Sequence, residues 1–167
     1  MRTIAQKIIK THSEAADLCS RLRMMDGKKI VLTTGAYDII HDGHPKYFQA
    51  SKIFGDILIV GVNSDNSVRR VKGKKRPILT EGVRLQLVAG FESVDYTFIF
   101  DDDNTIADIV RPHVLVMSET SENGPEERKE QVAIIKRYGG IAEFLPAMSK
   151  VHTSGIIRTI VERYAEE

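Results

Sequence analysis

Five short apolar runs, each about as long as a β-strand, alternate with helical segments along this chain and constrain its fold more than any other feature. The second run, Ile57-Leu58-Ile59-Val60-Gly61-Val62, contains no polar residue, which is typical of a parallel strand covered on both faces. Strands that alternate with helices at this spacing predict an α/β fold: a doubly wound, parallel, five-stranded sheet of the Rossmann-like kind. The predicted strands are residues 30–33, 57–62, 96–100, 114–117 and 141–145.

Helical spacing and capping residues predict the segments between these strands. Thr11 and Glu14 have the spacing of a capping box, and Thr80 is expected to cap a later helix. Residues 64–78 are predicted to form a polar loop with a basic core. The buried side of the helix after Thr80 is expected to carry Val83, Leu87, Val88 and Phe91. The predicted helices cover residues 11–25, 45–54, 80–91, 105–110, 125–138 and 153–161.

Composition limits the possible classes of protein. The chain has 167 residues, of which 42% are hydrophobic, which predicts a single domain over 1–167 with 1–27 as an N-terminal helical extension. A net charge of +1 gives no overall attraction to nucleic acid or to a membrane, and we expect neither partner. Cys19 is the single cysteine, so no internal disulfide forms, and we expect no metal ligands in the chain. No apolar run approaches the ~20 residues of a membrane span and the N-terminus lacks a signal-peptide core, so a cytoplasmic protein is expected.

The segment Thr33 to Lys46 is a predicted turn between the first strand and a helix. Such a turn presents unpaired backbone N–H groups and the positive end of a helix dipole, and both attract phosphate. Gly35 and Gly43 allow close approach of the backbone, and Pro45 suits the first helical turn. The segment therefore predicts a phosphate-binding site at the carboxyl end of the first strand.

Two histidines, His41 and His44, stand on either side of Gly43 and are spaced so that both rings could face this site. Imidazole N–H groups can donate hydrogen bonds to phosphate oxygens as negative charge builds up during substitution at phosphorus. Lys46 stands in the first turn of the helix, where a cation is slightly unfavourable, which suggests a ligand. A pair of turn histidines, half of a metal site and a solvated lysine are the alternatives.

The run His41-Asp42-Gly43-His44, preceded by Thr34-Gly35-Ala36-Tyr37-Asp38 and followed by Lys46, resembles the nucleotidyltransferases with an H-x-G-H signature, in particular their cytidylyltransferase-like branch. Residues 61–65, 67–73 and 76–78 are most similar to the adenylyltransferase domain that makes ADP-heptose from a heptose 1-phosphate. Glycerol-3-phosphate cytidylyltransferase is a more distant likeness. The resemblance implies transfer of a nucleoside monophosphate from a triphosphate to a sugar 1-phosphate with release of pyrophosphate, with ATP and heptose 1-phosphate as the first choice.

Two alternatives to this activity stay open. One is a CTP-dependent enzyme that acts on glycerol 3-phosphate or another polyol phosphate. The other, of a different class, is a nucleotide-binding module without catalysis. The resemblance also implies Mg²⁺ bound through the triphosphate and a homodimer.

The resemblance assigns roles to residues of this sequence. The implied catalytic residues are His41, His44 and Lys46. The implied nucleotide-binding residues are Thr34, Gly35, Ala36, Tyr37, Gly43, Arg84, Thr153 and Ser154. The implied acceptor-binding residues are Asp38, Asn63, Asp65, Arg69, Lys72 and Arg76.

Several of these residues have a simpler explanation. The basic run from Arg69 to Arg76 could be a solvated loop or a nucleic-acid contact, although it lacks interleaved aromatic residues. Arg84 could form a salt bridge on a helix surface, and Thr153-Ser154 could be a helix cap. Asp42 is interpreted as fixing the turn through backbone N–H groups. The run Asp101-Asp102-Asp103 resembles a divalent-cation cluster, but acidic residues before a helix are also typical of capping.

Two segments depart from the family pattern. Heptose-type enzymes carry a Lys-Gly-Gly-Asp-Tyr-like segment where residues 117–122 read Met-Ser-Glu-Thr-Ser-Glu. In the second segment His152 replaces a hydroxyl residue and Ala147 stands at the place of an arginine, with Lys150 as the nearest replacement. The arginine belongs to the glycerol-3-phosphate branch of the family. The first segment helps to shape the nucleotide and acceptor pocket in the family, so the base and the acceptor stay open.

Overall fold

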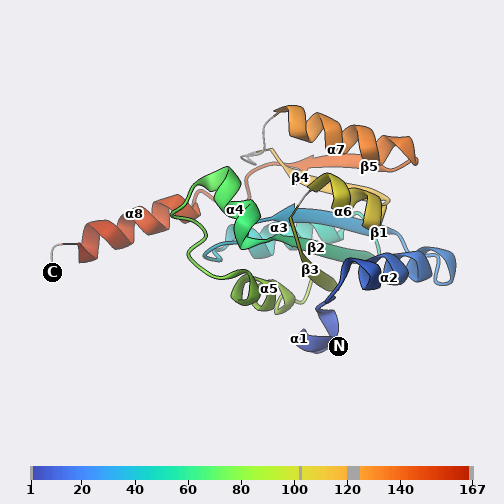
Figure 1. The fold of residues 1–167 in the computed structure, drawn as a ribbon, viewed down its shortest axis with the longest axis horizontal. Helices are drawn as coiled ribbons and strands as arrows, with labels where there is room; N and C mark the ends of the chain where they lie inside the picture. The colour runs from blue at the N-terminus through green and yellow to red at the C-terminus, as the bar shows by residue number, and fades with distance from the viewer. Residues whose placement is uncertain (1, 102, 120–124, 166–167) are drawn as a thin grey trace.

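The computed structural model describes residues 2–101, 103–119 and 125–165. Its centre is a five-stranded sheet in the order β3-β2-β1-β4-β5, in which every pair of neighbours is parallel (Figure 1). The predicted doubly wound α/β fold is therefore confirmed. The strands are β1 (Ile30–Gly35), β2 (Ile57–Asn63), β3 (Tyr96–Phe100), β4 (Val114–Ser118) and β5 (Ile141–Leu145).

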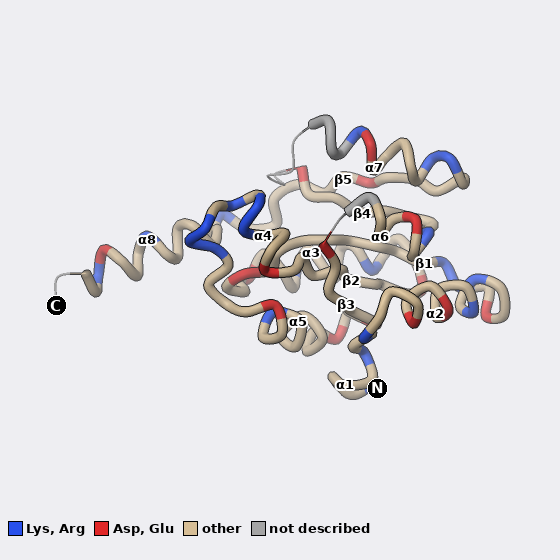
Figure 2. The backbone as a smooth tube through the Cα atoms, in the orientation of Figure 1, with Lys and Arg blue, Asp and Glu red and all other residues tan. Residues whose placement is uncertain are grey.

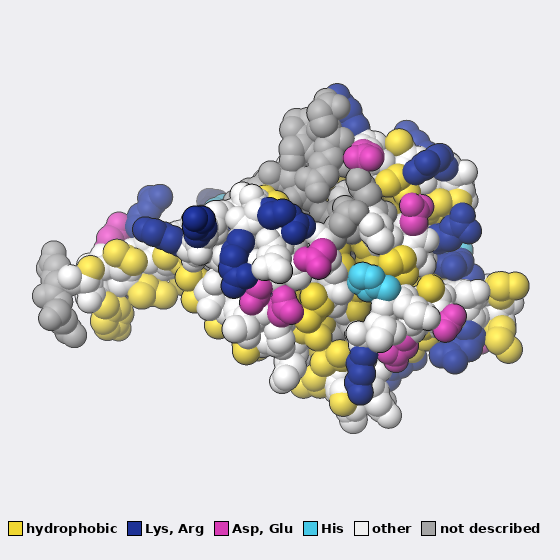
Figure 3. Space-filling view, in the orientation of Figure 1, with side chains coloured by type: hydrophobic (Ala, Val, Ile, Leu, Met, Phe, Trp, Pro, Cys, Tyr) yellow, Lys and Arg dark blue, Asp and Glu magenta, His cyan; other side chains and the backbone are white. Residues whose placement is uncertain are grey.

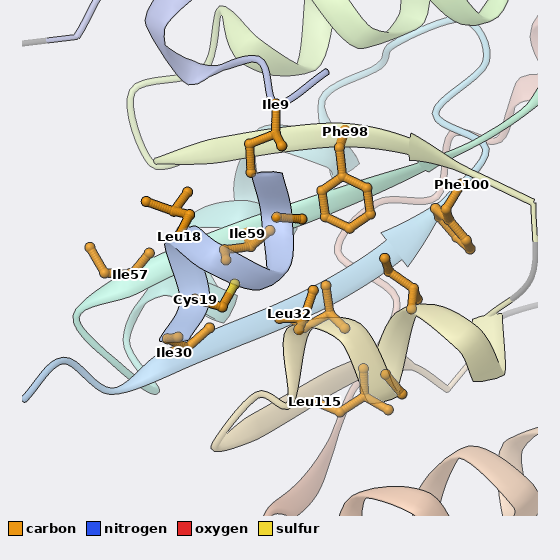
Figure 4. Close-up of a cluster of buried hydrophobic side chains, with 14 of the residues drawn as sticks. Ile9, Leu18, Cys19, Ile30, Leu32, Ile57, Ile59, Phe98, Phe100 and Leu115 are labelled. Atoms are coloured by element: carbon orange, nitrogen blue, oxygen red, sulfur yellow. The ribbon is translucent and has the colours of Figure 1, made fainter. Parts of the chain in front are cut away.

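Helices cover both faces of this sheet. Side chains from α2, α6 and α7 pack with alternate strand residues on one face, and side chains from α3 and α5 pack on the other. The first of these clusters is drawn in Figure 4, where Leu18 of α2 is seen next to Ile57 of β2, and Cys19 of α2 next to Ile30 of β1. The helices are α1 (Ile4–Lys7), α2 (His12–Met24), α3 (Gly43–Lys52), α4 (Asp65–Lys72), α5 (Glu81–Ala89), α6 (Asp103–Val110), α7 (Pro125–Arg137) and α8 (Thr153–Tyr164).

The strand order places the first strand at the point where the winding of the sheet reverses. Val31 of β1 pairs with Leu58 of β2 on one side and with Val114 of β4 on the other. In open parallel sheets a crevice forms at the carboxyl ends of the strands at such a switch point. The turn after β1 is therefore where the fold offers a binding site.

The segment 64–78 differs from the prediction, because residues 65–72 form the helix α4 instead of a loop. The Ser64 hydroxyl caps the helix by accepting from the N–H of Ser67, and Gly73 ends it with φ of 86°. Only Ser67 and Val68 of this helix are buried, so its sequence has no apolar stripe to reveal it.

The helix α5 lies where it was predicted, but its buried face differs. Val83 and Leu87, expected inside, are 46% and 43% exposed. The buried positions are instead Arg84, Leu85, Val88 and Ala89. The prediction was wrong at these positions because hydrophobic periodicity places only apolar side chains on the buried face of a helix. Here the charged Arg84 occupies that face.

The last helix, α8, extends away from the sheet (Figure 1). None of its residues is buried, and Ile160, Val161 and Tyr164 are between 49% and 69% exposed. Within the described ranges, no helix is both long and apolar enough to cross a bilayer.

Candidate active site

A cavity of about 510 Å³ opens at the carboxyl end of β1. Its wall comes from the turn before α3, from α4 and the loop after it, from the end of β4, from α7 and from residues 146–154. Most residues implied by the family resemblance lie on this wall: Thr34, Gly35, Ala36, Tyr37, Asp38, His41, Gly43, His44, Asn63, Lys72, Arg76, Thr153 and Ser154. Four implied residues lie outside the wall: Lys46, Asp65, Arg69 and Arg84.

The two histidines of the turn lie side by side on the wall, with ring centroids 4.1 Å apart. The N–H of Gly43 donates to Nδ1 of His41 (3.2 Å), and the N–H of His41 donates to Nδ1 of His44 (3.1 Å). A neutral imidazole that accepts at Nδ1 carries its proton at Nε2. The backbone of the turn thus favours an Nε2–H donor on His41. Nδ1 of His44 also lies 3.3 Å from the His41 carbonyl, so the proton of the His44 ring can sit on either nitrogen.

Both imidazoles are neutral at pH 7. Burial, followed by the neighbouring His41, lowers the pKa of His44 to about 4. Burial also lowers the pKa of His41, against the opposing effect of the Asp42 carboxylate. Two neutral rings can approach each other this closely, whereas two imidazolium ions would repel.

Gly43 allows two side chains to pack closely against the first turn of α3. A Cβ at this position would lie 3.0 Å from Cε1 of His41 and 3.0 Å from Cβ of Ser149, which is closer than such atoms normally pack. The same close approach brings the segment after β5 against the first turn of α3. Gly35 is covered in a similar way, because a Cβ there would lie 2.9 Å from Cζ of Tyr37.

Lys46 is held at the edge of the site by Asp42. Its Nζ lies 2.6 Å from the Asp42 carboxylate, and its side chain is 56% exposed. The other carboxylate oxygen accepts from the Ser149 hydroxyl at 2.6 Å. Hydrogen bonds from Lys46 and Ser149 lower the pKa of Asp42 to about 2. The interpretation of Asp42 as a backbone cap is wrong, since its side chain makes no cap hydrogen bond and is occupied by these two side chains.

Asp38 anchors the loop that follows α4. Its buried carboxylate accepts from Nε of Arg76 (2.6 Å) and from the N–H groups of Ile78 and Leu79 (both 2.9 Å). Burial alone would raise the pKa of Asp38, but the two N–H donors and the guanidinium outweigh it and lower the pKa below its usual range. The Thr153 hydroxyl donates to the Asp38 carbonyl at 2.7 Å, which brings the start of α8 to the wall. Arg76 also lines the cavity.

Arg84 lies behind the wall and is fully buried. Its guanidinium donates to the carbonyls of Leu79, Ala36 and Asn63 and to the carboxylate of Asp65. These four acceptors come from the turn after β1, from the end of β2, from the start of α4 and from the loop 73–80. Arg84 therefore positions the wall, and the salt bridge considered in the sequence analysis exists in the interior instead of on the surface.

The wall also contains residues that the sequence analysis did not assign to the site. The Tyr47 hydroxyl lies 3.0 Å from the Thr33 hydroxyl and donates to the Val116 carbonyl (3.2 Å), so it spans the crevice between β1 and β4. Arg70 donates to the Asp101 carbonyl at 2.7 Å, and the Asp101 carboxylate accepts from Ser64. A basic run was the only sequence signal for Arg70. The remaining unassigned wall residues include Ser67, Met117, Ser118, Gln131, Ser149 and His152.

Charge is unevenly distributed around the cavity. Figure 2 shows Lys and Arg concentrated on α4 and the loop after it, and Figure 3 shows basic side chains over α4 and the adjoining part of α8. Arg70, Lys72 and Arg76 bring this charge to the cavity wall.

Within residues 2–101, 103–119 and 125–165, no three His, Cys, Asp or Glu side chains form a group that could hold a metal ion. Of the acidic run 101–103, position 102 lies outside the described residues.

Two proteins, both named Bifunctional protein HldE, are similar to this chain. The protein from Geobacter metallireducens is 40% identical over 146 residues, which are 84% of this chain and 29% of that protein. The one from Helicobacter pylori strain P12 is 45% identical over 118 residues, which are 70% of this chain and 26% of that protein. This chain thus spans less than a third of the length of these relatives.

Solved structures support the same relationship. A lipopolysaccharide core biosynthesis protein from Thermoplasma volcanium has a TM-score of 0.62 and 29% identity, and the match covers 75% of this chain and all of that one. A pantoate-beta-alanine ligase from Francisella tularensis shares the fold, with a TM-score of 0.56, 15% identity and coverage of 89% of this chain and 69% of that one. A family model described as cytidylyltransferase-like matches residues 32–159, which hold the paired imidazoles and all the lining residues of the cavity. With the fold, the turn geometry and this match in agreement, the chain belongs to the cytidylyltransferase-like family of nucleotidyltransferases.

Proposed function

We propose that this chain transfers a nucleoside monophosphate from a nucleoside triphosphate to a sugar 1-phosphate and releases pyrophosphate. ATP and a heptose 1-phosphate are the first choice of substrates. The likeness of residues 61–78 to ADP-heptose-forming domains supports this choice, as does the similarity to a lipopolysaccharide core biosynthesis protein. CTP with a polyol phosphate is the second choice, because the family model carries the cytidylyltransferase name.

The observation that carries the proposal is the pair of imidazoles, His41 and His44, that lie side by side on the cavity wall beside the N-terminus of α3 and can each present an Nε2–H donor. Neutral donors of this kind can hold phosphate oxygens without a change of protonation. In the proposed reaction, an anionic phosphate oxygen of the acceptor attacks the α-phosphorus in line. The new oxygen–phosphorus bond forms as the bond from the α-phosphorus to the bridging oxygen breaks, and pyrophosphate leaves with the electron pair.

The residues of the chain act by positioning and by stabilising charge. His41 and His44 would donate to the triphosphate as charge shifts toward the leaving group, and Lys46 would add a cation after it separates from Asp42. Arg70, Lys72 and Arg76 would hold the phosphate groups of donor and acceptor. Mg²⁺ bound through triphosphate oxygens would neutralise further charge there. No covalent enzyme intermediate is needed.

The test is a pyrophosphate-release assay with Mg²⁺, each of the four nucleoside triphosphates and a panel of phosphorylated sugars and polyols. We expect pyrophosphate only when a triphosphate and a sugar 1-phosphate are both present. Tight nucleotide binding without release across the panel would instead identify a non-catalytic module. Direct titration with a polynucleotide checks the expected absence of nucleic-acid binding, which would show a steep salt dependence if it occurred.

We also propose that the chain forms a homodimer. The exposed apolar side chains of α8 support this, because such a projecting face is typical of a helix that packs against another chain. Light scattering coupled to size-exclusion chromatography measures the state directly, and a monomer at micromolar concentration would contradict the proposal.

A further inference from the structure

The buried side chains that the structure describes on α7 include a glutamine. Gln131, Ile134, Ile135 and Tyr138 follow at the i, i+3, i+4, i+7 spacing that places side chains on one face of a helix. Ile134 and Ile135 are 5% and 0% exposed and belong to the hydrophobic core. Gln131 is 4% exposed, so a polar amide occupies a position that would otherwise suit an apolar side chain.

This amide lies on the wall of the cavity. Because α7 follows β4, its first turns start near the carboxyl edge of the sheet, where the cavity opens. Among the residues that the structure describes, none hydrogen-bonds to the Gln131 side chain. Its amide is not among the fully enclosed side-chain atoms without a partner, so it is open to the cavity. The amide offers two N–H donors and one carbonyl acceptor to a ligand there.

The charge of the wall indicates which part of a nucleotide reaches Gln131. The triphosphate is attracted to the end of the cavity beside α4, where Arg70, Lys72 and Arg76 lie. The base must then extend toward the opposite end. The described wall residues on that side, from β4, α7 and the segment after β5, are uncharged: Met117, Ser118, Gln131, Pro146, Ala147 and Met148.

We propose that Gln131 selects the base of the donor nucleotide by pairing with an exocyclic amino group and the ring nitrogen next to it. The amide carbonyl accepts from the amino group, and the amide N–H donates to the ring nitrogen. Adenine and cytosine both present this pair of groups, whereas guanine and uracil present a carbonyl beside a ring N–H. This inference rests on the proposed function, since it assigns the base-reading residue of that same site.

The test compares the four nucleoside triphosphates with the wild-type chain and with Gln131→Leu and Gln131→Glu. We expect wild type to prefer ATP or CTP, and Gln131→Leu to lower kcat/KM for that nucleotide by about tenfold to 100-fold, with GTP and UTP changed by less than about threefold. Gln131→Glu presents acceptors only, so it should shift the preference toward GTP or UTP, whose bases carry a ring N–H. A preference that stays the same in both variants would overturn the proposal.

Two controls separate the possible failures. Gln86→Leu, at an exposed position of α5, should behave like wild type in all four assays. Binding of inorganic tripolyphosphate should be unchanged in both Gln131 variants, which shows that the variants are folded and that the phosphate end is intact. If wild type turns over no nucleotide at all, the proposed function fails. In that case the ratio of ATP or CTP affinity to tripolyphosphate affinity still tests Gln131, and an unchanged ratio would overturn its role.

Discussion

Nζ of Lys46 lies 2.6 Å from the carboxylate of Asp42, one turn earlier on α3, and this ion pair keeps the lysine off the cavity wall. The pair is exposed to solvent, so little free energy is needed to separate it. A triphosphate at the N-terminus of α3 offers Lys46 a more highly charged partner nearby. The lysine is therefore placed to change partners when a nucleotide binds.

We expect Lys46→Ala to lower kcat/KM for the nucleoside triphosphate by about tenfold to 100-fold, on the scale of one lost charge-assisted contact. The melting temperature should change little, because an exposed ion pair contributes little to stability. Steady-state kinetics and thermal melts measure the two effects. Lys136→Ala, at an exposed position on α7 away from the cavity, is the matched control. Equal activity of the two variants would remove Lys46 from the proposed mechanism.

The paired imidazoles predict a large effect on turnover. Loss of the Nε2–H donor in His44→Ala should lower kcat by about 10²–10³, the range seen when one oxyanion-type donor is removed. The far-ultraviolet circular dichroism spectrum should stay the same as that of wild type. His12→Ala removes an exposed imidazole outside the cavity and should keep wild-type turnover. A His44→Ala enzyme with near-normal kcat would show that the donor is not used.

The lowered pKa of His44, about 4, predicts how stability depends on pH. Between this value and the usual histidine pKa of ~6.5, the unfolded chain binds a proton that the folded chain does not, so stability falls as the pH drops through this window. His41 and His113 also have lowered pKa values and act in the same direction. In His44→Gln the melting temperature should decline less between pH 6.5 and 4 than in wild type. Parallel curves for the two proteins would contradict the assignment.

Arg84 predicts the largest loss of stability. Its removal leaves three carbonyl groups and the Asp65 carboxylate without their buried donor. Breaking a buried charged network of this kind costs about 3–5 kcal/mol. A domain of this size loses about 2–4 °C of melting temperature per kcal/mol. We therefore expect Arg84→Ala to melt at least about 6 °C below wild type. Arg158→Ala, at an exposed position of α8, should melt at the same temperature as wild type. A melting temperature within 2 °C of wild type, as a rough threshold, would show that the network is not stabilising.

The sheet and the turn could be predicted from the sequence because both depend on neighbouring residues. An uninterrupted apolar run identifies β2, and the glycines and histidines of the turn lie within one short segment. Contacts between distant segments had no such signal. Neither the Ser149 hydroxyl on Asp42 nor the Thr153 hydroxyl on the Asp38 carbonyl follows from spacing along the chain.

Buried polar residues account for most of what the sequence analysis missed. Arg84 and Gln131 each occupy an interior position of a helix where hydrophobic periodicity expects an apolar side chain. Helix α4 was missed for the opposite reason, since nearly all of its residues are polar and it buries only Ser67 and Val68. Apolar patterns locate a core, but they do not show which polar groups are enclosed between the core and a cavity.

The glycine between the two histidines offers a test of the geometry itself. A Cβ in Gly43→Ala would lie 3.0 Å from His41 and from Ser149, so the imidazole or the segment after β5 must shift. Displacement by even a fraction of an ångström misaligns the donors, and we expect kcat to fall by about 10²-fold. Gly82→Ala is a matched control because no atom lies within 4 Å of its Cβ and the position is exposed on α5. This control should keep full activity and gain about 0.5–1 kcal/mol of stability, since alanine favours a helix over glycine. Gly43→Ala with wild-type kcat would mean that the turn tolerates the extra methyl group, and that the close approach of His41 and Ser149 to Gly43 does not set the position of the ring.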